Sequence, residues 1–225
     1  MVSGLAVTGN VEKETCMMEF HKYIQDLDEL PSPRILNNHQ FFEVQPKDML
    51  RKRVKVAFIY RNPKDVVVSY YHHVKRLNDY YEYTGDFKSF LVRFAEGLLD
   101  NNSMFDYLKS WENGIKENPD MNIYMVSYED LQAEPLPHLR RLSKFLGKDY
   151  NDTFLESLVK ATSFDAMKRQ KGDVISDSSG SIMYRKGKLF GDWKNYFTVA
   201  QSLWFDHIIR TRMGKSTMFP FKYSI

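Results

Sequence analysis

The chain has 225 residues, of which 43% are hydrophobic and 27% are charged, so it is long and apolar enough to bury a full core in one domain covering 1–225. Its 32 Lys and Arg residues exceed its 29 Asp and Glu residues by only 3, which argues against bulk nucleic-acid binding and favours a local anion pocket. A single cysteine, Cys16, excludes an internal disulfide, and no Cys/His spacing matches a metal site. No apolar run approaches the ~20 residues of a membrane span. We therefore expect a cytoplasmic protein that binds neither a metal nor a membrane.

A helix is predicted to run from about residue 11 to Leu30 and to end at Pro31 and Pro33. The short extended segment after it, Arg34 to Leu36, brings His39 to its carboxyl end, and in an open parallel sheet this edge is where ligands bind. An imidazole with a pKa of about 6.5 accepts a hydroxyl proton near neutral pH, so His39 is a candidate general base. A capped surface histidine is the alternative interpretation.

The most informative stretch is VKVAFIYRNPKDVVVSYY, residues 54–71. Its apolar first half, 54–60, is typical of a parallel strand covered on both faces, and Pro63 fits the first position of a helix. The backbone N–H groups at such a helix start bind anions. Arg61 stands at that edge and Ser69 follows two turns along the helix, so the pattern predicts a phosphate site, with a surface arginine and an ordinary helix cap as the alternative.

Helices and strands alternate through the rest of the chain. Two amphipathic helices are predicted in 84–99 and 103–119, a strand in 121–128, and further helices in 135–146, 151–161 and up to Gly214. The apolar residues expected to face the core are Phe87, Phe90, Leu91, Phe94, Leu98, Phe105, Leu108, Trp111, Ile115, Trp204, Phe205, Ile208 and Ile209. Three strands separated by helices predict an α/β fold, a parallel sheet flanked by helices with right-handed crossovers.

Two segments carry a family resemblance: YRNPKDVVVSYYHH (60–73) and RKGKLFGDWKNYFTVAQ (185–201). Together with LPSPRILNNH (30–39), SYEDL (127–131) and TSFDAMK (162–168), they resemble the cytosolic sulfotransferases. The resemblance implies the P-loop NTPase-like sulfotransferase fold. It also implies transfer of a sulfuryl group from 3′-phosphoadenosine 5′-phosphosulfate (PAPS) to a hydroxyl or amine of a small-molecule acceptor such as a phenol, steroid or xenobiotic.

The same resemblance assigns roles to individual residues. His39 takes the place of the catalytic base. The residues implied to hold the 3′-phosphate of the cofactor are Arg61, Ser69, Arg185, Lys186 and Gly187, and those implied to frame its adenine are Tyr128, Thr162 and Phe164. From the residues alone, Tyr128 and Phe164 are equally well explained as packing, and the Gly- and Ser-rich stretch 172–191 as a solvated loop.

The sequence departs from the family pattern in four places. The N-terminal Pro-Lys-Ser-Gly-Thr-Thr loop has no match, so we expect an N-terminally truncated domain, and Asn37 stands where the family has a lysine. Gly187 and Gly191 are one residue further apart than usual, and Leu203 replaces the glutamate of the dimerisation segment, which leaves a homodimer open. The alternative function is therefore a catalytically inert family member that binds the 3′-phosphoadenosine end of the nucleotide or a protein partner.

Overall fold

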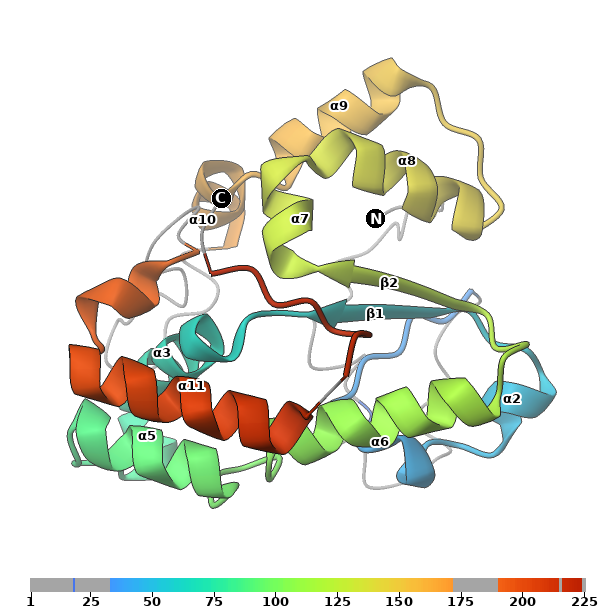
Figure 1. Ribbon diagram of the computed structural model, residues 1–225. Coiled ribbons are helices and arrows are strands. Elements are labelled where there is room, and N and C mark those ends of the chain that lie inside the picture. The colour runs from blue at the N-terminus through green and yellow to red at the C-terminus, as the bar shows by residue number, and fades with distance from the viewer. Residues whose placement is uncertain (1–17, 19–32, 172–189, 215, 224–225) are drawn as a thin grey trace.

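Two parallel strands lie at the centre of the structure, with helices on either side of them (Figure 1). The computed structural model describes Met18 and residues 33–171, 190–214 and 216–223. The described elements in chain order are η3 (Phe42–Val44), α2 (Asp48–Arg51), β1 (Val56–Tyr60), α3 (Pro63–Arg76), α4 (Asn78–Tyr81), α5 (Phe87–Glu96), α6 (Met104–Glu117), β2 (Ile123–Ser127), α7 (Tyr128–Ala133), α8 (Pro135–Phe145), α9 (Asp152–Ala161), α10 (Phe164–Lys171), η4 (Asp192–Asn195) and α11 (Val199–Met213).

The pairing of β1 with β2 confirms the α/β class. The strands are parallel, in a register that places Val56 opposite Ile123 and Tyr60 opposite Ser127, and the chain passes through α3, α4, α5 and α6 between them. The predicted strand at Arg34–Leu36 is wrong within the described residues, because that segment does not join the sheet. Ile35 is 54% exposed and Leu36 is 42% exposed, so burial of these side chains does not hold the segment against the sheet. The helix predicted before it lies outside the described residues, apart from Met18.

Within the described residues, one face of β1 is covered and the other is not. Phe58 and Tyr60 are buried, whereas Ile59 on the opposite face is 58% exposed. Phe58 packs against Trp111 of α6 at 5.0 Å between ring centroids and against Phe219 at 5.8 Å. The expectation of a strand covered on both faces is therefore wrong, since an unbroken apolar run does not specify how many faces are packed.

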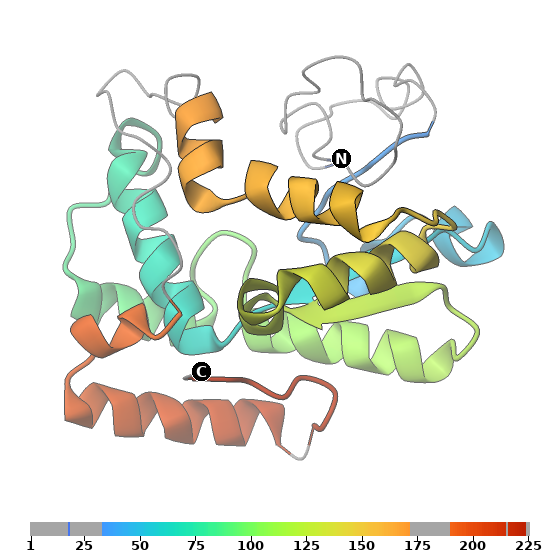
Figure 2. The same ribbon diagram turned by 90° about the horizontal axis from the view of Figure 1, so that it is seen from above.

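The predicted helices form and supply the core. The residues buried from them are Phe90, Leu91 and Phe94 of α5, Phe105, Leu108 and Trp111 of α6, and Phe205 and Ile209 of α11. Figures 1 and 2 show α6 and α11 on one side of the strands and α7, α8 and α9 on the other. Two residues expected to point inward do not, because Leu98 is 62% exposed and Trp204 is 38% exposed. No helix among the described residues is long and apolar enough to span a membrane.

The C-terminal segment, residues 216–223, runs back between α11 and β1 toward the start of α3 (Figures 1 and 2). Phe219 is buried and its ring meets Tyr60 edge-on at 5.3 Å. Further along, Lys222 forms an ion pair with Asp130 of α7, and Tyr223 lies edge-on to Trp193 at 6.4 Å. This segment therefore joins the core to the carboxyl ends of both strands.

Candidate functional site

The turn from β1 into α3 has the geometry predicted from the sequence. Pro63 occupies the first turn of α3, where its missing N–H costs no helical hydrogen bond, and Asn62 is the N-cap. The Asn62 side chain accepts a hydrogen bond from the backbone N–H of Asp65 at 2.8 Å. The positive end of a helix of 14 residues thus lies at the carboxyl end of β1.

Arg61 is held between an aromatic ring and a carboxylate at this helix start. Its guanidinium carbon lies 4.4 Å from the ring centroid of Tyr128, and its Nη2 lies 3.9 Å from Oδ2 of Asp65. The Arg61 side chain keeps 21% of its surface exposed. Tyr128 is the first residue of α7, so the structure brings together two of the residues predicted to contact the cofactor.

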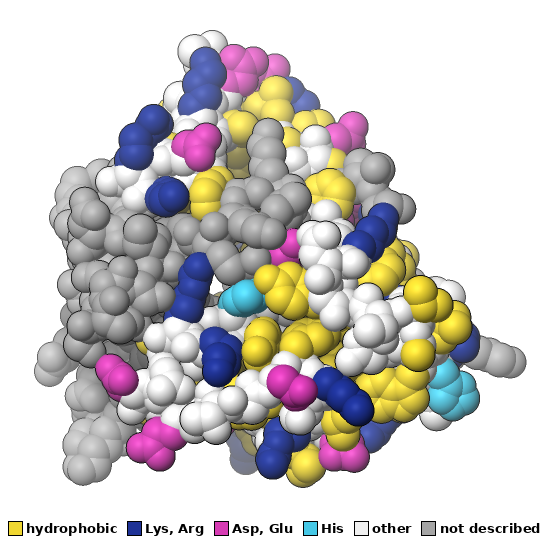
Figure 3. Space-filling model, turned by 90° about the vertical axis from the view of Figure 1, so that its left-hand side faces the viewer, with side chains coloured by type: hydrophobic (Ala, Val, Ile, Leu, Met, Phe, Trp, Pro, Cys, Tyr) yellow, Lys and Arg dark blue, Asp and Glu magenta, His cyan; other side chains and the backbone are white. Residues whose placement is uncertain are grey.

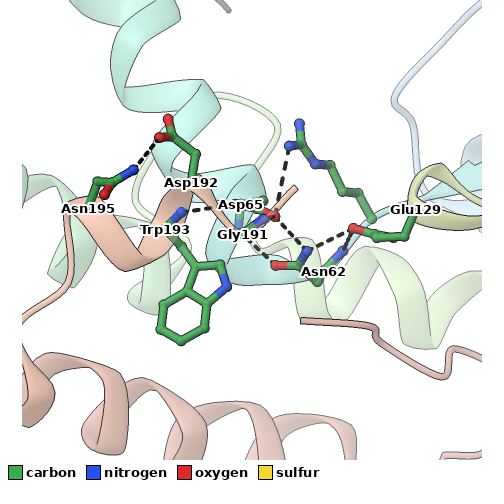
Figure 4. A network of polar contacts seen from close by, with 8 residues as sticks. Asn62, Asp65, Glu129, Gly191, Asp192, Trp193 and Asn195 are labelled. Carbon is green, nitrogen blue, oxygen red and sulfur yellow. Dashed lines mark hydrogen bonds and ion pairs between the residues drawn. The ribbon is translucent and has the colours of Figure 1, made fainter. Parts of the chain in front are cut away.

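Asp65 links α3 to a distant part of the chain. Its Oδ2 accepts a hydrogen bond from the Gly191 N–H at 2.7 Å, and its Oδ1 accepts one from the Trp193 N–H at 3.0 Å (Figure 4). The residue is only 1% exposed, so the carboxylate is almost fully removed from water. Gly191 adopts a φ of +85°, a left-handed conformation that glycine adopts without a Cβ clash.

A second buried carboxylate supports the same turn from the other side. Oε1 of Glu129 accepts hydrogen bonds from the backbone N–H of Asn62 at 3.0 Å and from its Nδ2 at 2.8 Å (Figure 4). The same Nδ2 donates to Oδ2 of Asp65 at 2.8 Å. Glu129 is fully buried, and its Oε2 has no hydrogen-bond partner in the described part of the chain. Asn62, the residue after Arg61, therefore bridges two carboxylates.

Sequence reasoning did not identify Asp65 and Glu129 as site residues. Two signals were present. The Asn-x-x-Asp spacing of residues 62–65 fits a cap at the start of a helix, and Glu129 is the second residue after β2, whose carboxyl end adjoins that of β1. Neither signal specifies that both carboxylates meet at Asn62, because this depends on how the strands pair.

Lys64, three residues after Arg61, connects α3 to α11 through polar contacts. It is 3% exposed, and its Nζ donates to Oγ of Ser202 at 2.8 Å and pairs with Oδ1 of Asp206 at 2.8 Å. The ammonium also lies 4.3 Å from the ring centroid of Trp193. Lys64 thus fastens α3 to α11, and Arg61 is the cation of this turn that faces the candidate site.

The remaining residues predicted to bind the cofactor lie in three other parts of the chain. Ser69 is exposed on α3. Thr162 caps the C-terminus of α9 and donates from Oγ1 to the Leu158 carbonyl at 2.7 Å, and Phe164 begins α10 and is half-buried. The predicted phosphate-binding residues Arg185, Lys186 and Gly187 lie outside the described residues.

His39 is exposed in the irregular segment before η3, and its two neighbours bond to Gln45 and to α6. The preceding residue, Asn38, accepts a hydrogen bond from Nε2 of Gln45 at 2.9 Å. The following residue, Gln40, accepts one at its carbonyl from the indole N–H of Trp111 at 3.1 Å. Arg61, by contrast, contacts Asp65 of α3 and Tyr128 of α7.

The basic side chains are dispersed over the surface shown in Figure 3. On the face shown in Figure 3, Lys and Arg side chains are scattered among acidic and hydrophobic ones and form no continuous basic patch over the described atoms. Asp130 is close to the turn: burial opposes its ionisation, but hydrogen bonds from Lys222 and Ser127 lower the pKa of its carboxyl below the usual value. No cluster of His, Cys, Asp and Glu side chains in the described ranges is arranged to hold a metal ion.

Comparisons with known proteins agree with this geometry. The model of the sulfotransferase domain family matches residues 5–217. Sulfotransferase 1B1 of dog (Canis lupus familiaris) is 35% identical over 202 residues, covering 87% of this chain and 67% of that protein, and human sulfotransferase 1C2 (Homo sapiens) is 36% identical over 191 residues, covering 82% and 63%. A crystal structure of mouse sulfotransferase SULT7A1 complexed with PAP superposes with a TM-score of 0.76 at 31% identity, covering 85% of this chain and 69% of that one. The chain thus spans about two thirds of the length of these relatives.

Proposed function

Because the chain belongs to the sulfotransferase domain family, we propose that the start of α3 binds the 3′-phosphate of PAPS and of its product adenosine 3′,5′-bisphosphate (PAP). The observation that carries the proposal is the placement of Arg61, whose guanidinium is held over Tyr128 at the positive end of α3. A guanidinium fork and a helix N-terminus both favour a phosphate dianion.

The other cofactor contacts follow from the family resemblance. Ser69 adds a hydroxyl donor on α3, and Arg185, Lys186 and Gly187 complete the phosphate site. Tyr128 with Thr162 and Phe164 frames the adenine. The Arg61–Tyr128 contact supports this assignment, because it puts the proposed phosphate and adenine contacts next to each other.

The proposed reaction is sulfuryl transfer to a small acceptor in the cytoplasm. His39 removes the proton from a hydroxyl or amine of a phenol, steroid or xenobiotic as the acceptor attacks sulfur. The new bond to sulfur forms in line with the breaking bond between sulfur and the 5′-phosphate oxygen, and PAP leaves. Neither nucleic acid nor a membrane takes part, and the reaction needs no metal.

A homodimer stays a prediction. The dimerisation segment that the family resemblance implies begins at Lys194 and continues into the start of α11, where Thr198 is the N-cap. Val199 is 78% exposed and Leu203 is 64% exposed, so this surface is open in the single chain. Sedimentation of the wild type tests whether a dimer forms, and sedimentation of Leu203→Glu, which restores the glutamate of the family's dimerisation segment, tests whether Leu203 prevents it.

Calorimetric titration with PAP, and with adenosine 5′-monophosphate as the ligand without a 3′-phosphate, tests the cofactor site. We expect Arg61→Ala to abolish the preference for PAP, since it removes the guanidinium that faces the ligand. Arg140→Ala is the matched control, because Arg140 pairs with Asp152 on an exposed surface of the α8–α9 hairpin. A wild-type chain that binds both nucleotides equally would contradict the proposal.

The second candidate function is an inert protein that binds only the 3′-phosphoadenosine end of the nucleotide. The observation in its favour is that Gln40, next to His39, is bonded to α6, whereas the ion pair of Arg61 with Asp65 does not include His39. The His39→Ala variant separates the two functions. It should remove turnover of PAPS and leave PAP affinity unchanged if the chain is an enzyme, whereas a wild-type chain that binds PAP without turning over PAPS supports the inert alternative.

A further inference from the structure

We propose that Asp65 is a positioning residue of the nucleotide site: its buried carboxylate fixes the backbone of Gly191–Trp193 and the guanidinium of Arg61 against the start of α3. This inference rests on the proposed function. It concerns a residue that does not itself contact the nucleotide, since the carboxylate is turned into the protein and is 1% exposed.

Four groups from two parts of the chain, residues 61–62 and 191–193, converge on this carboxylate. Oδ2 accepts from the N–H of Gly191 at 2.7 Å and from Nδ2 of Asn62 at 2.8 Å, and it lies 3.9 Å from the Arg61 guanidinium. Oδ1 accepts from the N–H of Trp193 at 3.0 Å. Hydrogen bonds to an ionised acceptor are stronger than neutral ones, and burying a carboxylate without such donors is costly in free energy. The positions of these donors are therefore coupled to Asp65.

The chemistry requires a carboxylate at this position, not merely a side chain of its size. An amide of the same shape has one oxygen, so it cannot accept on both sides. If the amide oxygen faces Trp193, the amide NH₂ faces the N–H of Gly191 and the Nδ2 of Asn62, and donor meets donor. Asp65→Asn thus releases at least one side of the network with almost no change in volume.

The attachment of α3 to α11 is separate from this network. Lys64 makes that attachment through Ser202 and Asp206. Loss of the Asp65 contacts should consequently loosen the segment that starts at Gly191 and the orientation of Arg61 more than it loosens the core. The consequence for ligand binding is specific to the 3′-phosphate, because Arg61 is the proposed phosphate ligand.

The experiment compares wild type, Asp65→Asn and Ile209→Val in two measurements. Ile209 is a buried α11 residue, and its truncation gives a mildly destabilised control that leaves the network intact. The first measurement is hydrogen exchange at the Gly191 and Trp193 amides without nucleotide. The second is the ratio of the dissociation constants for adenosine 5′-monophosphate and PAP, which isolates the contribution of the 3′-phosphate.

We expect Asp65→Asn to speed exchange at both amides and to lower this ratio by about tenfold or more, the scale of one hydrogen bond to a charged group. Ile209→Val should change neither. Asn62→Ser is a second variant for the case in which Asp65→Asn does not fold: serine retains the N-cap acceptor but removes the Nδ2 donor, and should lower the ratio in the same direction.

Three outcomes overturn the inference. A wild-type ratio well above one that Asp65→Asn leaves unchanged refutes the role of Asp65 and leaves the proposed function standing. An equal loss in Asp65→Asn and Ile209→Val shows a merely structural role. A wild-type ratio of one removes the proposed function together with the inference, even if exchange at Gly191 responds to the substitution.

Discussion

The buried cation Lys64 allows a quantitative test of how the candidate site is attached to the core. Lys64 is 3% exposed and Asp206, its partner at 2.8 Å, is 33% exposed in its side chain. Breaking a fully buried pair by removing one partner costs about 3–5 kcal/mol, whereas an exposed pair contributes at most about 1 kcal/mol. For this pair, in which Lys64 is buried and Asp206 is partly exposed, we expect Asp206→Asn to lower the free energy of unfolding by about 1–3 kcal/mol.

The cost should disappear when Lys64 is already replaced. In a Lys64→Met background there is no buried ammonium to leave uncompensated, and Asp206 is exposed enough to be hydrated. Asp206→Asn should therefore cost less than about 0.5 kcal/mol there, as for an ordinary surface change. The difference between the two backgrounds is the coupling energy of the pair.

Urea unfolding of the four proteins at neutral pH measures these free energies, with the m-value checked for constancy. Lys64→Met also removes the contact with Trp193 at 4.3 Å, but that loss is common to both members of its background and cancels in the cycle. An Asp206→Asn cost that is the same in both backgrounds would refute the reasoning, because it would show that Lys64 does not depend on this carboxylate.

Three further predictions concern residues around the strands and the site. Burial, and then the charge of Arg141, lowers the pKa of His138, so the unfolded chain binds the proton more readily than the folded chain. The free energy of unfolding should therefore fall as the pH drops below about 6.5. Urea unfolding across this pH range should show a weaker fall for His138→Gln than for the wild type, and parallel curves would contradict the assignment. Gly114→Ala should destabilise by about 1–3 kcal/mol in the same assay, because an added Cβ would lie 2.2 Å from the Phe42 ring; an unchanged midpoint would mean that the ring moves at little cost. Gly191→Ala should weaken PAP binding and lower the melting temperature. The φ of Gly191 is +85°, a conformation that costs a non-glycine residue about 1–2 kcal/mol. A variant that melts at the wild-type temperature would show that the turn relaxes.

Local sequence features predicted the elements of the site well. Pro63 after an apolar run specified where α3 begins, and the helix starts there because proline fits its first turn. The amphipathic stripes of α5 and α6 were also predictable, since 3.6-residue spacing fixes which face packs. The α/β class followed from the alternation of these elements.

What could not be predicted depends on contacts between distant residues. Ile59 belongs to an unbroken apolar run, yet it is exposed because the packing partners of β1 lie on the Phe58 face. The contact of Asp65 with Gly191 joins residues 126 positions apart, and that of Asn62 with Glu129 joins residues 67 apart. No local pattern encodes such distances, and the role of both carboxylates appears only once β1 and β2 are paired.

The proposed phosphate site lies next to two buried carboxylates, which looks unfavourable at first because a carboxylate repels a phosphate. The donors around Asn62 resolve the conflict: Glu129 receives two N–H bonds from this residue, and Asp65 is bonded by Asn62, Gly191 and Trp193. These bonds satisfy both oxygens of Asp65 and the Oε1 atom of Glu129 from within the protein. The Arg61–Asp65 distance of 3.9 Å is longer than the roughly 2.7–2.9 Å of a charge-assisted hydrogen bond, so Asp65 orients the guanidinium without such a bond. A phosphate that approaches to that shorter distance gains more from Arg61 than Asp65 does, and the arrangement therefore favours the ligand.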